Sequence, residues 1–108
     1  MPWVSLCEMS ELVEGKGKYV EVEGSQLAVF LHEGEPRVVD NTCPHAGGSM
    51  AGGFVSEGCA VCPWHYWHFD LKTGEMPGRP IVKIRSYKTR ILKREGHSDL
   101  VQADVPMP

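Results

Sequence analysis

Two short loops, each holding one cysteine and one histidine, limit the possible folds and functions of this chain more than any other feature. The first loop, residues 43–48, reads CPHAGG, and the second, residues 62–65, reads CPWH. Together they give the pattern C-x-H-x16-C-x2-H. Two thiolates and two imidazoles suffice to bind one metal centre. We therefore expect the rest of the chain to be a scaffold that presents four ligands: Cys43, His45, Cys62 and His65.

The cysteine count allows a second interpretation. Cys7, Cys43, Cys59 and Cys62 form an even set, which would predict two disulfides in a short secreted chain. The N-terminal residues show no basic segment followed by an apolar stretch, so we expect no secretion signal and a cytoplasmic protein. Disulfides are rare in that compartment. We therefore predict that Cys7 and Cys59 are small buried side chains.

Length and charge exclude several classes of protein. The 108 residues fit one domain, residues 1–108, and leave no room for a second catalytic domain. The net charge of −3 provides no basic surface for nucleic acid, although it slightly favours a partner with a basic docking patch. No apolar run approaches the roughly 20 residues of a membrane span. We expect neither nucleic acid nor membrane as a partner.

Glycine and proline divide the chain into short runs of strand character. Twelve Gly and eight Pro separate about nine or ten such runs, which predicts an all-β sandwich or barrel. The run at residues 27–31 is apolar on both faces and should be a central strand. We expect one helical turn at residues 10–15, with Ser10 as its N-cap. We also expect an irregular connector at residues 76–80, a strand at 81–87, and a partly disordered tail at 95–108.

The two loops resemble the cluster-binding loops of Rieske [2Fe–2S] proteins. Residues 43–47, CPHAG, and 62–65, CPWH, match the two motifs of that family, and residues 69–74 match the strand and turn that commonly follow. The likeness spans residue 3 to about residue 93. It implies an antiparallel Rieske-type scaffold in which residues 41–78 form a small inserted cluster-binding subdomain.

The resemblance also implies a role for each ligand. Cys43 and Cys62 would hold one iron, and His45 and His65 would hold the other. Neutral imidazole donates less charge than thiolate, so the histidine-bound iron is the one expected to take the electron. Zinc is the alternative metal for the same four residues. Structural zinc sites, however, usually pair cysteine with cysteine and histidine with histidine, whereas each motif here mixes them.

Residues between the ligands are expected to tune the cluster. Gly47 and Gly48 can bring backbone N–H groups close to sulfur, because glycine has no side chain to keep the backbone away. Trp64 and Trp67 flank His65 and are expected to shield the cluster from water. Three further histidines, His32, His68 and His97, are expected to lie on the surface or on a strand face rather than to act as ligands.

Three positions depart from the pattern of high-potential members of the resembled family. Those proteins carry an extra cysteine in each loop, where Gly48 and Trp64 stand here, and a serine where Trp67 stands. The departures imply the disulfide-free, ferredoxin-type branch and the lower part of the Rieske range of roughly −150 to +300 mV. A fourth position, Tyr66, usually holds glycine. Its side chain must point away from the cluster, or the loop must bend differently.

Two electron-carrier functions follow from the resemblance. One is a Rieske ferredoxin that passes electrons from a flavin reductase to an oxygenase, as in aromatic-ring dioxygenase systems. The other is the small subunit of an NAD(P)H-dependent nitrite reductase, bound to a large flavin and sirohaem subunit. We slightly prefer the nitrite reductase small subunit as the family. We expect electron transfer as the activity, and we expect no substrate site in this chain. A basic stretch at residues 83–94 is either a solvated strand face or a docking surface.

Overall fold

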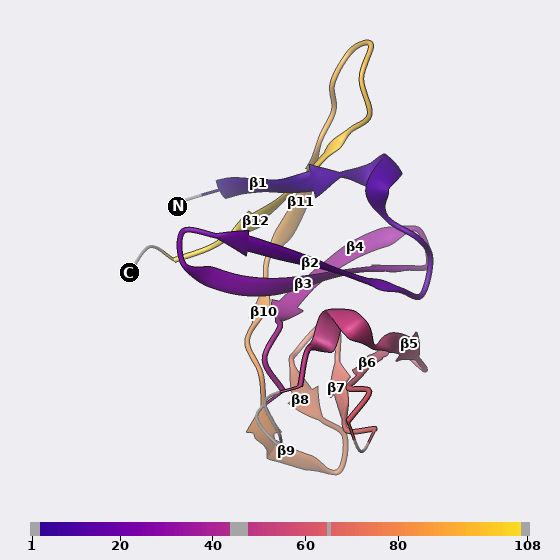
Figure 1. Cartoon of the computed structure of the whole chain (residues 1–108), viewed down its shortest axis with the longest axis vertical. Helices are drawn as coiled ribbons and strands as arrows, with labels where there is room; N and C mark the ends of the chain where they lie inside the picture. The colour runs from indigo at the N-terminus through magenta and orange to yellow at the C-terminus, as the bar shows by residue number, and fades with distance from the viewer. Residues whose placement is uncertain (1–2, 44–47, 65, 107–108) are drawn as a thin grey trace.

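The structure, a computed structural model, describes residues 3–43, 48–64 and 66–106. These residues form two lobes that follow one another along the 42 Å long axis of the molecule (Figure 1). Both termini of the described chain lie in the upper lobe. Within the described ranges the helices are single turns, and no helix is long and apolar enough to cross a membrane.

Two antiparallel sheets make the upper lobe. The first has the order β1–β12–β11, with β1 at Trp3–Glu8, β11 at Thr89–Leu92 and β12 at Leu100–Asp104. The second has the order β10–β4–β3–β2, with β2 at Gly17–Val22, β3 at Ser25–His32, β4 at Glu35–Asp40 and β10 at Ser86–Tyr87. A 3-10 turn, η1 (Met9–Glu11), follows β1.

The lower lobe is built from shorter strands. One sheet has the order β5–β6–β7, with β5 at Phe54–Ser56, β6 at Cys59–Val61 and β7 at His68–Asp70. A two-stranded sheet joins β8 (Glu75–Met76) to β9 (Arg79–Lys83). A second 3-10 turn, η2 (Met50–Gly52), leads into β5. The described residues therefore confirm the all-β fold.

Strand β3 is central, as its sequence predicts, because its two faces enter two different cores. Successive side chains of a strand point to opposite faces of the sheet. Leu27 and Val29 enter the upper core, with Val101 and Val105, whereas Ala28 and Phe30 enter the lower core. The lower core also contains two of the expected ligands, Cys43 and Cys62. One strand therefore supports both lobes.

Three hairpins use the same Glu-Gly pair. Residues 23–24, 33–34 and 57–58 all have positive φ, between 50° and 80°, as a type I′ turn requires. Glycine takes this conformation without cost, whereas the glutamate before it carries a strain of roughly 1–2 kcal/mol. The repeated dipeptide sets the register of β2 with β3, β3 with β4, and β5 with β6.

Four expectations about individual segments are wrong. The helical turn η1 has Glu8 as its N-cap, two residues earlier than the predicted Ser10, and the Glu8 N–H donates to Glu11 Oε2 at 2.7 Å. Residues 76–80 belong to the β8–β9 hairpin rather than to an irregular connector. The strand expected at 81–87 is interrupted between β9 and β10. The expected tail contains β12, the middle strand of its sheet.

Candidate metal centre

The two cysteines of the motif lie at the ends of strands and inside the lower core. Cys43 follows β4 and Cys62 follows β6, and both have no exposed surface. Neither forms a disulfide, nor do Cys7 and Cys59, which are each 6% exposed and confirm the prediction of buried thiols. The motif cysteines are therefore free thiols, held away from water by the lobe that carries them.

Each cysteine closes its loop with the same hydrogen bond. The N–H of Cys43 donates to the carbonyl of Gly48 at 2.9 Å, and the N–H of Cys62 donates to the carbonyl of Trp67 at 2.8 Å. In both loops the acceptor is the fifth residue after the cysteine. The two loops therefore have matched closures, which fix the position of each cysteine relative to the end of its loop.

The two sulfur atoms lie close to one another. Burial raises the pKa of the Cys62 thiol, and a hydrogen bond with the Cys43 thiol raises it further. The backbone N–H of Trp64 acts in the opposite direction by hydrogen bonding to the Cys62 sulfur. Two adjacent buried thiolates repel each other unless a cation lies between them. The pair is therefore suited to ligate one metal ion together.

Asn41 joins the two ends of the first loop, a role that its sequence position did not indicate. Its side-chain oxygen accepts hydrogen bonds from the N–H of Ala51 at 2.9 Å and the hydroxyl of Ser49 at 3.1 Å. Its backbone carbonyl accepts one from the N–H of Met50 at 2.7 Å. Asn41 is 7% exposed, so these bonds satisfy its two buried oxygen atoms and hold η2 against the strand before Cys43.

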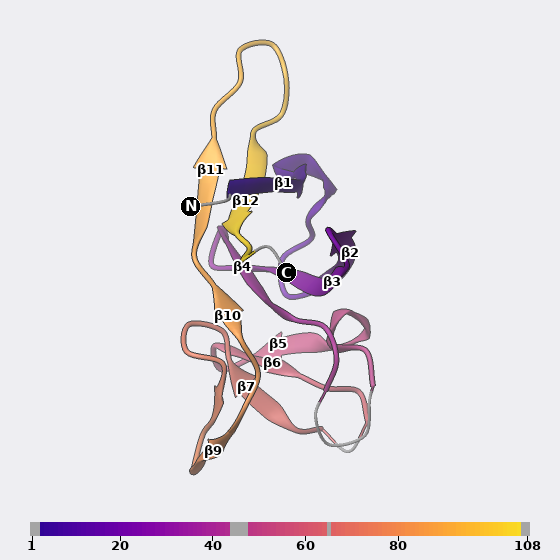
Figure 2. The same cartoon turned by 90° about the vertical axis from the view of Figure 1, so that its left-hand side faces the viewer.

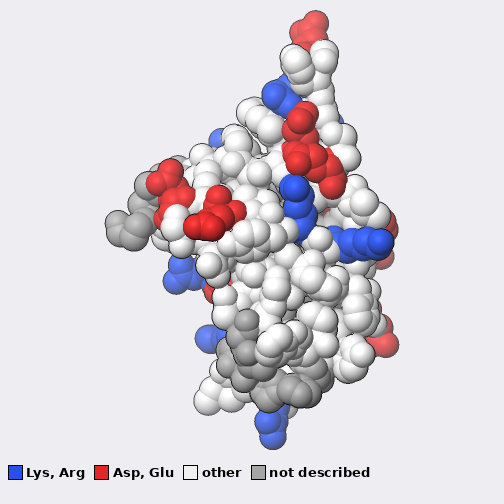
Figure 3. Space-filling view, in the orientation of Figure 1, with Lys and Arg blue, Asp and Glu red and all other residues white. Residues whose placement is uncertain are grey.

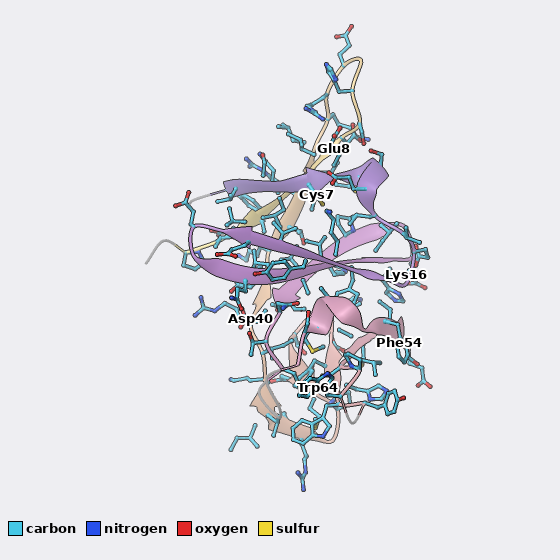
Figure 4. All side chains as sticks on the ribbon, in the orientation of Figure 1. Cys7, Glu8, Lys16, Asp40, Phe54 and Trp64 are labelled. Atoms are coloured by element: carbon cyan, nitrogen blue, oxygen red, sulfur yellow. The ribbon has the colours of Figure 1, made fainter. Side chains whose placement is uncertain are left out.

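Trp64 covers the first loop at Gly48. A methyl group on Gly48 would lie 3.0 Å from Cγ of Trp64 and 3.2 Å from the sulfur of Cys62. The indole therefore occupies the space that a side chain at position 48 would need. Trp64 remains 54% exposed at the end of the lower lobe (Figure 4), whereas Trp67 is half-buried and packs against the lower core.

Tyr66 takes a backbone conformation that favours glycine. Its φ is +58°, in the left-handed region, and its side chain is 65% exposed. The side chain lines an open hollow between β7 and the β8–β9 hairpin, together with Met76 and Pro77. The loop therefore keeps a glycine-type bend, and the tyrosine is accommodated by exposure. A non-glycine residue in this conformation carries a strain of roughly 1–2 kcal/mol.

Replacing Tyr66 by glycine and by alanine should separate the backbone from the side chain. Both variants remove the ring, but only alanine retains the strain at positive φ. We expect Tyr66→Gly to have a free energy of unfolding about 1 kcal/mol higher than Tyr66→Ala. Urea denaturation of the two variants measures the difference. Equal stabilities would show that the left-handed conformation is not maintained at this position.

Two of the four predicted ligands, His45 and His65, lie outside the described residues, as do Pro44 and Gly47. The prediction that Gly47 and Gly48 supply N–H groups to sulfur stays a prediction; among the described residues, the Trp64 N–H bonds to the Cys62 sulfur. His32 is partly buried, whereas His68 and His97 are exposed. These three confirm the expectation of surface or strand-face positions.

Residues 2–88 match the Rieske [2Fe–2S] domain family. The chain belongs to this family. Its cofactor is therefore a Rieske-type [2Fe–2S] cluster, and the buried, adjacent, disulfide-free thiols of Cys43 and Cys62 fit thiolate ligation of such a cluster. The zinc alternative has no comparable support.

Proteins similar to this Rieske domain differ greatly in length. A ferredoxin component of the naphthalene 1,2-dioxygenase system of Pseudomonas putida is 33% identical over 90 residues, which are 82% of this chain and 86% of that protein. The cholesterol 7-desaturase nvd of Hemicentrotus pulcherrimus is 43% identical over 75 residues, 68% of this chain. That match spans only 16% of the desaturase.

A solved structure agrees with the fold over nearly the whole chain. A protein assigned as the NADH-dependent nitrite reductase small subunit of Mycobacterium tuberculosis superposes with a TM-score of 0.83 and 26% identity. The superposition covers 98% of this chain and 97% of that one. The two-lobed arrangement described above is therefore shared with a protein of equal extent.

Proposed function

We propose that this Rieske domain carries single electrons between redox proteins, without a substrate site of its own. The observation that carries the proposal is the pair of buried, free thiols of Cys43 and Cys62, which lie side by side at two loops with matched closures. When bound, the cluster accepts and returns one electron. The chain's part is to hold the ligands, to exclude water from the sulfur side and to keep the loops rigid.

The ligand assignment is part of this proposal. Cys43 and Cys62 ligate one iron, supported by the proximity of their sulfur atoms, and His45 and His65 ligate the other. Residues 41–78 form the cluster-binding subdomain around them. Burial raises the pKa of the Cys62 thiol, and metal ligation would act in the opposite direction by compensating the thiolate charge.

Replacement of His45 or His65 by alanine should remove the visible absorption of the purified protein and its rhombic EPR signal after reduction. Each imidazole supplies one of only two bonds to its iron from the chain, and alanine supplies none. His68→Ala is the matched control, because His68 is exposed on β7 only three residues after His65. An unchanged spectrum in His45→Ala would exclude that residue as a ligand.

The nitrite-reductase assignment and the dioxygenase assignment name different partners. Superposition over 97% of the Mycobacterium protein supports a small subunit bound to a large flavin and sirohaem subunit. Similarity over 86% of the Pseudomonas ferredoxin supports a carrier between a flavin reductase and an oxygenase. We propose the first as the principal assignment. Co-purification from the native host separates them, because the first predicts a sirohaem flavoprotein and the second an oxygenase or a separate reductase.

A cytoplasmic location belongs to the same proposal. All four cysteines are free, which suits a compartment that keeps thiols reduced. Fractionation of the native host should find the protein with cytoplasmic markers, and recovery from a secreted or periplasmic fraction would contradict this part.

A further inference from the structure

Charge is distributed unevenly between the ends of the chain. Residues 1–40 contain eight acidic and three basic side chains, whereas residues 41–85 contain three acidic and four basic ones. The lobe that carries the cysteines is therefore positive, although the protein as a whole has a net charge of −3. In Figure 3 most acidic side chains of this face lie on the upper lobe, where basic ones are also present, and basic side chains mark the left-hand edge and the lower end of the other lobe.

Three of the four basic side chains, Arg79, Lys83 and Arg85, form a stripe along β9 and the segment after it. Side chains at alternate positions of a strand share a face. Ile81, Lys83 and Arg85 alternate with the half-buried Val82 and the buried Ile84. Arg79 precedes them beyond the exposed Pro80 and lines the hollow beside Tyr66. Ile81 is 89% exposed, more than any other large apolar residue in the described part of the chain. The stripe thus presents an apolar centre between cations.

These cations are not neutralised within the described structure. None of the ion pairs between described residues involves Arg79, Lys83 or Arg85, and the Arg85 guanidinium lies 5.9 Å from the centre of the Tyr87 ring. The basic residues farther along the chain are different. Lys93 pairs with Asp99 at 3.2 Å, and Arg94 pairs with Glu8 at 2.9 Å. The basic stretch read from the sequence therefore splits into a paired part and an unpaired part.

The unpaired part adjoins the first cluster loop. Lys83 and Arg85 line an open hollow together with Thr42, the residue before Cys43. Arg85 is fixed there by two backbone bonds, because its N–H donates to Asp40 Oδ2 at 3.0 Å and its carbonyl accepts from the N–H of Asp40 at 2.9 Å. Figure 2 shows β9 at the lower left of the lower lobe, with β10 and then β11 continuing upward from it.

Two carboxylates face the stripe and limit its charge. The Asp40 carboxylate accepts hydrogen bonds from the Tyr87 hydroxyl at 2.6 Å and from the N–H of Arg85, so both its oxygens are engaged. Glu75 lies opposite Lys83 in the β8–β9 register without forming an ion pair. An oxidised cluster adds nothing, because two ferric ions are balanced by two sulfides and two thiolates when the imidazoles are neutral. The stripe remains positive.

We propose that Arg79, Ile81, Lys83 and Arg85 form the docking surface for a redox protein whose own surface presents carboxylates around an apolar patch. The proposal rests on the electron-carrier function and adds the chemistry of the partner. Charge complementarity increases the rate at which the two proteins meet in the correct orientation. Burial of Ile81 then stabilises the complex. The charge expected on the partner's docking surface is thus negative, whereas the net charge of the whole chain suggests a positive one.

Voltammetry on charged monolayers tests this surface without a known partner. The cluster-loaded protein is adsorbed on gold coated with carboxylate-terminated or with amine-terminated alkanethiols. A carboxylate layer should attract the stripe and bring the cluster loop toward the electrode, whereas an amine layer should attract the acidic upper lobe. We expect electron exchange at least about tenfold faster on carboxylate, with adsorption weakening as salt shortens the Debye length.

Two charge-reversal variants localise the effect. Lys83→Glu should slow exchange on the carboxylate layer several-fold, whereas Lys93→Glu should leave it unchanged. Both variants change the net charge equally, but Lys93 follows β11 at the start of the loop farthest from the cluster lobe, with its side chain 85% exposed (Figure 1). Faster exchange on the amine layer, or equal loss in both variants, would overturn the proposal.

Adsorption on a mixed monolayer tests the contribution of Ile81 separately. On a mixed layer of carboxylate and methyl termini, wild type should adsorb more tightly than Ile81→Ser, and equal adsorption would remove Ile81 from the docking surface. Failure of the electron-carrier function itself would appear differently. In that case no reversible one-electron wave would be seen in solution with a soluble mediator, whatever the monolayer.

Discussion

Replacing Gly53 by alanine should destabilise the protein by about 3 kcal/mol and prevent cluster assembly. Gly53 lies between η2 and β5, where a methyl group would overlap the carbonyl oxygen of Val61. That oxygen belongs to backbone, so rotation of a side chain cannot relieve the contact. Val61 directly precedes Cys62, and any shift of its backbone moves a ligand. The change therefore acts on folding and on the metal centre together.

The neighbouring glycine provides the control for this prediction. At Gly52 the nearest atom to an added methyl group is Cγ of Pro63, at 3.9 Å, which is an ordinary contact. Gly52→Ala should therefore keep its stability within about 1 kcal/mol and assemble a normal cluster. Urea denaturation of the metal-free proteins and iron content after reconstitution measure the two effects. Equal behaviour of Gly52→Ala and Gly53→Ala would show that the backbone contact with Val61 is not rigid.

Replacing Val101 by aspartate should unfold the protein or cost at least about 4 kcal/mol at neutral pH. Val101 has no exposed surface and lies in the upper core, in the middle strand between β1 and β11. An ionised carboxylate there loses its hydration without gaining a partner. The protonated form is less costly to bury, so part of the loss should be recovered as the pH falls toward 4.

A leucine on the adjacent strand gives the matched substitution. Leu92 ends β11 and is 43% exposed, so Leu92→Asp introduces the same carboxylate where water can reach it. We expect a cost below about 1 kcal/mol, measured by thermal or urea unfolding alongside Val101→Asp. A tolerated aspartate at Val101 would mean that β12 is not a stable part of the sheet.

The C-terminal strand shows why parts of the fold could not be predicted from the sequence. Val101, Ala103 and Val105 alternate with polar residues and are all buried, but the run is short and lies close to prolines. Its burial depends on β1, which begins about a hundred residues earlier and pairs with it directly. The β8–β9 hairpin was not predicted for another reason. Pro80 lies within β9 at the edge of a two-stranded sheet, where the missing N–H is tolerated.

The metal centre was predictable to the extent that side chains define it. Thiolate and imidazole ligands need particular residue types, and strand β3 needs two apolar faces, so both leave a pattern in the sequence. The loop closures use the carbonyls of Gly48 and Trp67, and among the described residues the N–H of Trp64 bonds to sulfur. Backbone groups are present in every residue, so nothing in the sequence distinguishes them. Asn41 acts through its side chain, but it belongs to no sequence motif that would have connected it with Cys43.

The position of β3 between two cores has a consequence for the fate of the protein before it acquires iron. Because Leu27 and Phe30 come from one strand but stabilise different lobes, loosening the lower core also withdraws support from the upper one. Metal binding to the folded state raises the stability of everything coupled to that state. Chains without a cluster should therefore be more sensitive to proteases along their whole length. Iron supply would then set the lifetime of the protein as well as its activity.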